Sequence, residues 1–425
     1  MSSYSSRGRR SNQSRDSNNQ NKGHQPRIKP CRNFVQKGEC TQKNCAFAHV
    51  IKLHASITAT NKLKKDQQQH NNYKGYNSSN SKAKQYNAVT STAIWESPGG
   101  LKIFTGGQDG FWRLWDGSGG SFVKEFEHNM GQGAKVHCVN VTSNMFYCGF
   151  EGMPVIMPDI PVGMTHVWNL ANPSSPPLQF HLGPMVPYAH AKAVTCLLVV
   201  QDYIVTGAQD STICLWKQDA AKGAFALAKT FVGHAREITG LVVVNQSMLW
   251  SSSTDKTIRL WDLASGECKY VVAKNTPNAQ GVAGSAGSGH TKAVTCLVNF
   301  ESQVGNFVLS SSLDATVKAW NTMNAECMAT EPHGMGVVCM ALSADIKGNP
   351  LLLCGLENGD IMVRSILQTP TTPAFCLLLK LSFNYTFGHE DGSVKCLRAG
   401  PANTFLSGGE DGKLNVWQIT GDFGL

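Results

Sequence analysis

From about residue 87 onward the chain repeats one pattern of hydrophobic and polar positions. A short apolar run leads into a turn of small and polar residues, and a second apolar run then ends in tryptophan. Because strands are short, alternate between two faces and are bounded by turn residues, each copy predicts a pair of neighbouring β-strands. Five copies are clear: Thr105 to Trp115, Thr206 to Trp216, Ser251 to Trp261, Ser310 to Trp320 and Ser407 to Trp417.

Two weaker copies fill the gaps between the clear ones. One runs from Cys148 to Trp168, and the other runs from Cys354 to Arg364, where arginine replaces tryptophan. The seven closing positions are 44 to 59 residues apart, a spacing typical of four-stranded propeller blades with loop insertions. The pattern therefore predicts an all-β domain over residues 87–421, in which seven blades close a ring and protect most strand edges.

These repeats resemble the WD40 repeat, including a Gly-His dipeptide ahead of three of them (Gly233-His234, Gly289-His290 and Gly388-His389). The resemblance implies a seven-bladed WD40 β-propeller. Four repeats also contain the residue types of a hydrolase triad, but one active site would not occur four times, each time with a tryptophan six residues after the aspartate. In the WD40 family such residues form a hydrogen-bonded chain within a blade, and we predict this structural role for four sets: His190, Asp210, Thr206, Trp216; His234, Asp255, Ser251, Trp261; His290, Asp314, Ser310, Trp320; His389, Asp411, Ser407, Trp417.

Cysteine recurs at one position of the first strand of five repeats, at Cys138, Cys196, Cys296, Cys339 and Cys396. We interpret these thiols as small apolar groups where the inner strands crowd the axis, in preference to a ring of metal-binding or redox thiols. So many unpaired cysteines indicate a reducing, intracellular compartment. No signal peptide and no run of 18 apolar residues is evident, so we expect no membrane association.

The last repeat lacks an outer strand, because the chain stops eight residues after Trp417. A segment ahead of the first blade must then supply that strand. We predict that residues 50 to 58 close the ring, within a polar Asn/Gln/Ser-rich linker that spans residues 51–86.

A separate cluster of candidate metal ligands precedes the repeats. Cys31, Cys40, Cys45 and His49 lie within 19 residues, and three thiolates with one imidazole form a closed tetrahedral set for one structural Zn²⁺. A segment this short has no core of its own, so the metal would supply its folding energy, about 10 to 16 kcal/mol in finger-type sites. We assign residues 27–50 to this zinc finger.

The spacing of the four ligands resembles the CCCH zinc fingers, many of which bind single-stranded RNA. The resemblance implies that Phe34 and Phe47 stack on bases, and that Lys29, Arg32, Lys37 and Lys43 contact phosphates. Exposed aromatic rings beside cations suit single strands in general, although the two phenylalanines could instead merely cover the zinc. Here four residues separate the second and third cysteines, where five are commoner in the family.

The charge is divided unevenly between the two parts of the chain. Residues 1–86 hold 17 Lys/Arg and 3 Asp/Glu, a net charge of +14, whereas the remainder has a net charge of −5. Residues 1–26 have the composition of a disordered basic arm. Such an arm would add salt-sensitive attraction to phosphates, which does not by itself distinguish RNA from DNA.

On one face of the predicted ring, Lys192, Arg236 and Lys292 occupy the second position after their histidines. They form either an ordinary solvated rim or a cationic surface for RNA or an acidic partner. Two insertions are predicted on the same face, one containing Pro154, Pro158 and Pro161 and the other running from Lys274 to Gly289.

One finger ahead of seven repeats is the layout of the plant zinc-finger and WD-repeat protein group, which the sixth repeat also resembles at Gly336-Val337-Val338-Cys339-Met340. We therefore predict a non-enzymatic RNA-binding adaptor, in which the finger and arm hold single-stranded RNA while the propeller recruits proteins. The alternatives are a protein-interaction scaffold with a purely structural zinc, such as a ubiquitin-ligase substrate receptor, or DNA binding. We expect no small-molecule substrate, and a location in the nucleus or cytoplasm with the basic stretches favouring the nucleus.

Overall fold

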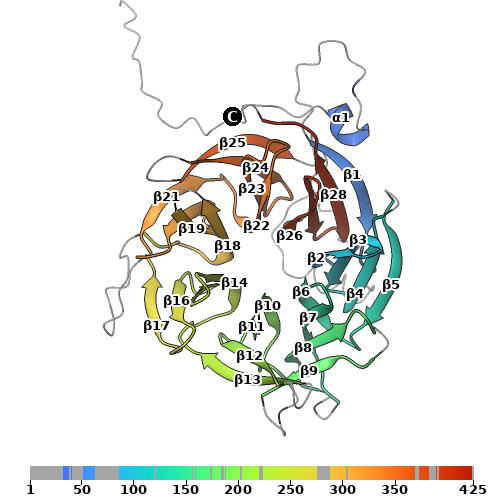
Figure 1. The fold of residues 1–425 in the computed structure, drawn as a ribbon, viewed down its shortest axis with the longest axis vertical. Coiled ribbons are helices and arrows are strands. Elements are labelled where there is room, and N and C mark those ends of the chain that lie inside the picture. Colours follow the sequence, from blue (N-terminus) through green and yellow to red (C-terminus); the bar gives the residue numbers. More distant parts are fainter. Residues whose placement is uncertain are drawn as a thin grey trace, which may run out of the picture.

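Seven antiparallel four-stranded units, here called blades 1 to 7, surround a central axis in the computed structural model (Figure 1). This arrangement confirms the predicted seven-bladed propeller. The structure describes residues 32–37, 40, 51–62, 86–118, 121–155, 157, 159–172, 175–182, 186, 188–201, 203–219, 224–274, 288–302, 305–368, 373–381, 389 and 392–423. Among these residues the only helix is α1 (Arg32–Lys37), and no helix is long and apolar enough to cross a bilayer.

Blades 1 to 3 each use four consecutive strands, counted from the axis outward. Blade 1 contains β2 (Val89–Ser97), β3 (Gly100–Gly107), β4 (Phe111–Asp116) and β5 (Val123–Asn129). Blade 2 contains β6 (Lys135–Val141), β7 (Met145–Gly152), β8 (Val162–Asn169) and β9 (Leu178–His181). Blade 3 contains β10 (Val194–Val200), β11 (Tyr203–Ala208), β12 (Ile213–Asp219) and β13 (Ala224–Phe231).

Blades 4 to 7 continue the ring. Blade 4 contains β14 (Ile238–Val244), β15 (Met248–Ser253), β16 (Ile258–Asp262) and β17 (Cys268–Val272). Blade 5 contains β18 (Val294–Ser302), β19 (Gly305–Ser312), β20 (Thr316–Asn321) and β21 (Cys327–Pro332). Blade 6 contains β22 (Val337–Ala344), β23 (Pro350–Leu356), β24 (Ile361–Gln368) and β25 (Pro373–Leu381), and blade 7 contains β26 (Val394–Ala399), β27 (Thr404–Gly409) and β28 (Lys413–Ile419).

The outer strand of blade 7 comes from the opposite end of the sequence. β1 (Ile51–Thr58) pairs antiparallel with β28, with Ile51 opposite Ile419 and Thr58 opposite Lys413. Within the segment to which the sequence pointed, residues 50 to 58, residues 51–58 form the closing strand. The backbone bonds that β28 would otherwise leave exposed are satisfied by a strand from ahead of blade 1.

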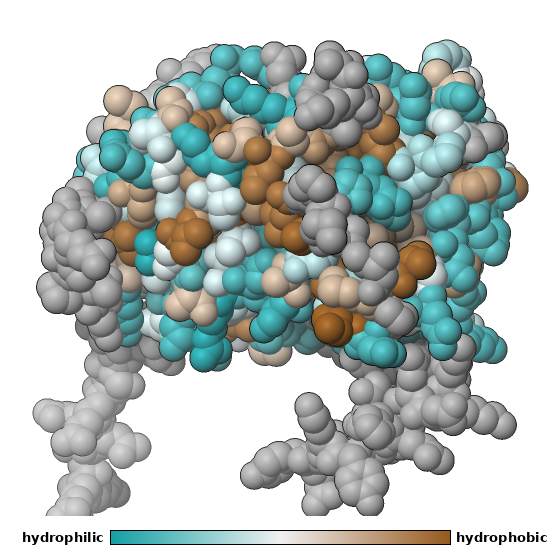
Figure 2. Space-filling model, turned by 90° about the horizontal axis from the view of Figure 1, so that it is seen from below, coloured by the Kyte–Doolittle hydropathy of each residue, from teal (hydrophilic) through white to brown (hydrophobic). Residues whose placement is uncertain are grey.

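Blades 2 and 3 are also joined at their outer edges. β9 and β13 pair in parallel, with Phe225 opposite Phe180 and Ala226 opposite His181, so the two blades form one eight-stranded sheet. The repeats gave no sign of this pairing, because it joins strands of two different units. Figure 2 views the wall of the ring from this side, where apolar and hydrophilic residues are interspersed.

The core consists of apolar layers between neighbouring blades. Tryptophans at the ends of the third strands are completely buried in four blades, at Trp216, Trp261, Trp320 and Trp417. Each inner strand also has a register irregularity one residue before its recurring small residue, for example between Val194 and Cys196 or between Ile238 and Gly240. A bulge of this kind turns one side chain out of its regular alternation.

Candidate functional site

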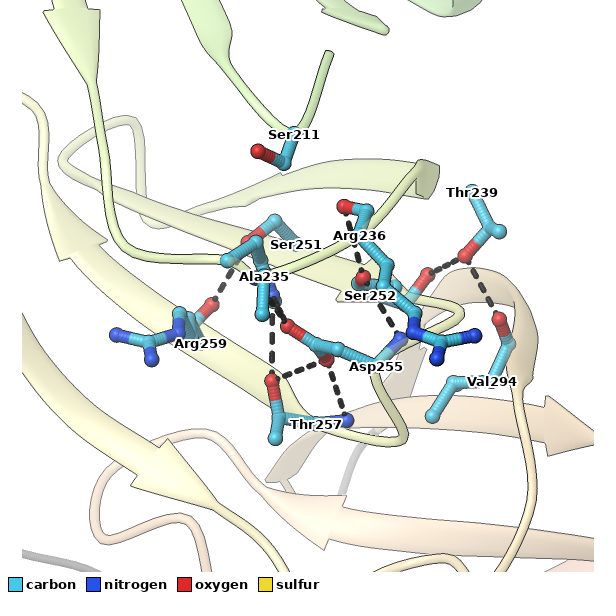
Figure 3. Close-up of polar contacts among 12 residues, drawn as sticks. Ser211, Ala235, Arg236, Thr239, Ser251, Ser252, Asp255, Thr257, Arg259 and Val294 are labelled. Carbon is cyan, nitrogen blue, oxygen red and sulfur yellow. Dashed lines mark hydrogen bonds and ion pairs between the residues drawn. The ribbon is translucent and has the colours of Figure 1, made fainter. Parts of the chain in front are cut away.

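The four predicted sets of polar residues each come together within one blade, and blade 4 shows the geometry. Figure 3 labels Ser251 and Asp255 of this set. His234 lies on the connection that leads into β14, Ser251 is on β15, and Asp255 is in the turn between β15 and β16. His234 Nδ1 is 2.8 Å from Asp255 Oδ2, and His234 Nε2 is 2.8 Å from Ser251 Oγ. Trp261 Nε1 donates to the same hydroxyl at 2.8 Å.

The donors and acceptors in this hydrogen-bonded set follow from the chemistry of the side chains. Because Asp255 accepts only, His234 Nδ1 carries a proton, and in the neutral ring Nε2 accepts from the Ser251 hydroxyl. Ser251 in turn accepts from Trp261, so each of the polar atoms in this hydrogen-bonded set of four residues has a partner. Burial lowers the pKa of His234, with Asp255 acting in the opposite sense, and the pKa of Asp255 is held below its usual range by its bonds to His234 and Thr257 in spite of burial.

The same contacts recur in the other three blades. The tryptophan-to-hydroxyl distances are 2.8 Å at Thr206, 2.7 Å at Ser310 and 2.9 Å at Ser407, and the histidine Nε2-to-hydroxyl distances are 2.7, 2.8 and 2.9 Å. Asp314 and Asp411 lie 2.9 and 2.8 Å from their histidines. In blade 3 the corresponding distance from His190 to Asp210 is 3.3 Å, and Thr212 lies closer, at 3.0 Å.

The burial of the hydroxyls decides what this arrangement can do. The hydroxyl-bearing residues of all four sets are 0 % exposed: Thr206, Ser251, Ser310 and Ser407. A nucleophile must reach a substrate atom, so these hydroxyls cannot act as hydrolase nucleophiles despite their contact with histidine. Their geometry links the second and third strands of a blade to the connection that enters it.

Each aspartate also fixes a tight turn. Asp255 accepts from the backbone N–H groups of Ala235 and Thr257, both at 2.9 Å. Lys256, which stands between Asp255 and Thr257 in the turn, has a φ of 75°. The equivalent turn residues Ser211 and Ala315 have φ values of 68° and 65°. The bonds to the carboxylate therefore hold a backbone conformation that non-glycine residues rarely adopt.

Blade 6 uses a different network, which the sequence analysis missed. Arg364, at the tryptophan position, is 2 % exposed and donates from Nε to His333 Nε2 at 3.0 Å. The same guanidinium pairs with Glu331 at 2.5 Å and donates to the carbonyl of Pro332 at 2.9 Å. Burial, together with the neighbouring Arg364, lowers the pKa of His333 to about 3. The signal in the sequence was Arg364 itself, since a buried guanidinium requires a nearby carboxylate and acceptors.

Blade 1 has a partial version of the network. Trp115 Nε1 donates to Thr105 Oγ1 at 3.0 Å, as in the complete blades. The aspartate of the turn, Asp109, instead pairs with Arg113 at 2.8 Å and accepts the backbone N–H of Asn61 at 2.7 Å. The residues that follow the closing strand are thereby tied to blade 1.

The joints between blades contain a second recurring contact. At four joints a threonine on the inner-strand bulge donates to the carbonyl of the residue just before the bulge of the next blade: Thr90 to Val136, Thr195 to Ile238, Thr239 to Val294 and Thr295 to Val337. The other three bulge positions hold His137, Val338 and Lys395. At those joints the next residue, a cysteine, contacts the corresponding carbonyl: Cys138 at Val194, Cys339 at Val394 and Cys396 at Val89, with sulfur–oxygen distances of 3.8, 3.5 and 4.0 Å.

The environment of these cysteines disfavours the thiolate form. Burial raises the pKa of all five thiols at the recurring position, and raises that of Cys396 to about 12. Since the thiolate is the form that attacks and binds metals, the sulfurs serve as compact groups at the joints. Among the described residues no three His, Cys, Asp or Glu side chains are grouped so as to hold a metal ion.

The predicted rim residues Lys192, Arg236 and Lys292 are all exposed on three consecutive blades. The backbone carbonyls of Arg236 and Lys292 accept from Ser253 and Ser312, at 3.2 and 3.3 Å. These bonds fix the main chain below two of the three side chains.

The predicted zinc ligands lie largely outside the described residues. Cys40 is half-buried, whereas Cys31, Cys45 and His49 fall outside, together with Lys29, Lys43 and Phe47. Arg32 and Phe34 lie in α1, and Lys37 at the end of this helix is exposed. Three thiols and one imidazole are a donor set that suits zinc, and they remain the candidate ligands.

Comparisons with known proteins agree with the fold. The family "WD domain, G-beta repeat" matches residues 184–217, 225–262, 285–321 and 381–418. The WD40 β-propeller domain of Doa1 has a similar structure, with a TM-score of 0.54 and 18 % sequence identity over 78 % of this chain and 93 % of that one.

Two plant relatives are named for a CCCH zinc finger. "Zinc finger CCCH domain-containing protein 17" of Oryza sativa subsp. japonica is 25 % identical over 92 % of this chain and 72 % of its own length. "Zinc finger CCCH domain-containing protein 59" of Arabidopsis thaliana is 29 % identical over 46 % of this chain, which spans only 34 % of that protein. The chain therefore contains four matches to the WD40 repeat within a β-propeller, and it is similar to plant proteins named for a CCCH zinc finger.

Proposed function

We propose that this chain is an RNA-binding adaptor, in which the N-terminal finger and basic arm hold single-stranded RNA and the propeller binds proteins. The observation that supports it most directly is the ligand set Cys31, Cys40, Cys45 and His49, which lies within a segment of high positive charge. The names of the two plant relatives point to the same kind of finger. A propeller with buried polar networks and no accessible nucleophile among them suits a protein-interaction scaffold.

The energetics explain why finger and arm would act together. Two stacked bases contribute about 2 to 6 kcal/mol, which alone corresponds to about millimolar affinity or somewhat better. Phosphate contacts from the arm, which belongs to the segment 1–86 with its net charge of +14, would add affinity that falls as salt rises. The stacking residues would supply the preference for unpaired bases, and the arm would supply most of the attraction.

Crosslinking of the full-length chain to RNA tests this proposal directly. The wild type is compared with Cys40→Ser, which removes a candidate ligand, and with Cys268→Ser, which changes a half-buried propeller thiol as a matched control. We expect the first variant to lose bound zinc and most of the recovered RNA, and the control to retain both. Equal RNA recovery from all three proteins would overturn the role of the finger.

Competition with single-stranded DNA of the same sequence separates the polymers. Equal displacement by both would favour general single-strand binding through phosphates and bases, since only a contact to the 2′-hydroxyl distinguishes RNA. Zinc content without binding to either polymer would favour the scaffold alternative. Charge reversal of Lys192, Arg236 and Lys292, assayed by RNA binding and by protein pull-down, would show which kind of partner uses the rim.

A further inference from the structure

The helix α1 lies against the strand that closes the ring. Val35 of α1 is fully buried and belongs to the same apolar cluster as Ile51, Ile419 and Phe423. α1 packs against β1, and Figure 1 shows both at the outer edge of blade 7. A helix of six residues is not stable by itself in water, so its order depends on what surrounds it.

The candidate metal ligands flank α1 and precede β1 in the sequence. Cys31 immediately precedes α1, Cys40 follows the helix by three residues, and His49 stands two residues before β1. A metal bound by all four ligands would close the chain between the helix and the strand. It would thereby restrict the freedom of the two elements that meet at Val35 and Ile51.

The closing strand is the part of the ring that most needs such a restriction. β1 pairs with β28, which lies more than 350 residues further along the sequence. Ser56 and Asn415, for example, are paired although 359 positions separate them. The docking of β1 therefore orders a long loop or a free end at an entropic cost. Any second attachment that holds β1 in place lowers that cost.

We propose that the metal-binding segment acts as a clamp on the ring, so that zinc binding and closure by β1 stabilise each other through Val35. This inference rests on the proposed zinc site. Coupling between two equilibria is reciprocal: if zinc favours the closed ring, then the closed ring binds zinc more tightly. α1 is accordingly the part of the metal-binding segment through which zinc would act on the blade 7 edge.

The test uses the full-length chain, with zinc counted by elemental analysis and unfolding followed by tryptophan fluorescence. We expect chelation of the zinc to lower the melting temperature by several degrees. Val35→Ala should still bind one zinc at saturation, but about tenfold more weakly, and its melting temperature should respond much less to chelation. Ile419→Ala, on the ring side of the same cluster, should weaken zinc binding in the same direction although it is far from the ligands in sequence.

Val317→Ala in blade 5 is the matched control, because Val317 is equally buried in a different apolar cluster. It should lower the melting temperature without changing the affinity for zinc or the response to chelation. A chain that binds one zinc and melts at the same temperature with and without it would overturn the clamp and leave the RNA proposal intact. A chain that binds no zinc would overturn the zinc site itself, which elemental analysis shows before any melting experiment.

Discussion

Thr239 donates its hydroxyl across the joint between blades 4 and 5 to the carbonyl oxygen of Val294, with 2.8 Å between the two oxygens (Figure 3). The same hydroxyl lies 2.9 Å from Ser252 Oγ. Thr239 occupies the bulge of the inner strand, which turns its side chain toward the neighbouring blade. Four of the seven joints have this bond, so it is a repeated contact that fixes one blade relative to the next.

Thr239→Val tests the contribution of one such bond. Valine keeps the shape of the side chain but leaves the carbonyl of Val294 and the hydroxyl of Ser252 without this partner. We expect the free energy of unfolding to fall by about 1 to 3 kcal/mol, measured by chemical denaturation. The matched exchange is Val338→Thr, which places a hydroxyl at the equivalent bulge of blade 6 and should stabilise the ring or leave it unchanged. Equal stability of wild type and Thr239→Val would contradict the role of the bond.

Ser310→Ala tests the structural role of the polar sets. The change leaves Trp320 Nε1 and His290 Nε2 without their shared partner in a site where Ser310 is 0 % exposed. We expect a loss of about 1 to 3 kcal/mol and a decrease in melting temperature of a few degrees, with RNA affinity unchanged. His290→Ala should behave in the same way.

Asn306, in the same blade, offers a control for Ser310→Ala because it lies near the start of β19 and is half-buried. Asn306→Ala should have a smaller effect on stability. A Ser310→Ala protein that melts like the wild type but no longer binds RNA would show that the set serves binding and not the fold.

Deletion of residues 51–58 tests ring closure. Without β1, the outer edge of β28 loses its backbone partners, and Ile51 no longer covers the cluster that contains Ile419. We expect the melting temperature to fall by several degrees, and the exposed edge to promote association. The measurements are differential scanning calorimetry and light scattering. Deletion of residues 63–70, which lie in the polar linker, serves as the control, and equal effects of the two deletions would contradict a specific closing role.

The sequence was sufficient for the repeated parts of this fold because their residues recur in step. The positions of Trp216, Trp261, Trp320 and Trp417 predicted the third strands, and the missing strand after Trp417 led to the closing segment. The polar sets were predicted for the same reason: four copies of His, Asp and a hydroxyl cannot be four accidents. Repetition supplied the evidence that a single copy would not have supplied.

The parts that the sequence did not predict depend on contacts between different units. The parallel pairing of β9 with β13 arises from how two outer edges meet, and no local pattern encodes it. The partner of Arg364 is His333, which stands at the histidine position of its own repeat but lacks the usual hydroxyl, because Cys354 replaces it. Likewise, nothing in the spacing of the zinc ligands indicated that Val35 would be buried against the ring.

The network in blade 6 predicts a specific dependence of stability on pH. The pKa of His333 is lowered to about 3 in the folded chain, whereas a histidine in the unfolded chain has a pKa of about 6.5. Between these values the unfolded state binds one proton more than the folded state, so the free energy of unfolding decreases as pH falls from the upper value toward the lower one. The slope from this group is at most about 1.4 kcal/mol per pH unit.

His333→Gln should remove this contribution while retaining an acceptor for Arg364. We therefore expect the variant to be less stable than the wild type at pH 7, but to lose less stability between about pH 6 and pH 4. Chemical denaturation of both proteins across this range measures the difference, in which the titration of the many carboxylates cancels. Parallel pH profiles for the two proteins would mean that His333 is protonated to the same extent in the folded and unfolded states. The buried guanidinium of Arg364 would then not hold the imidazole of His333 neutral.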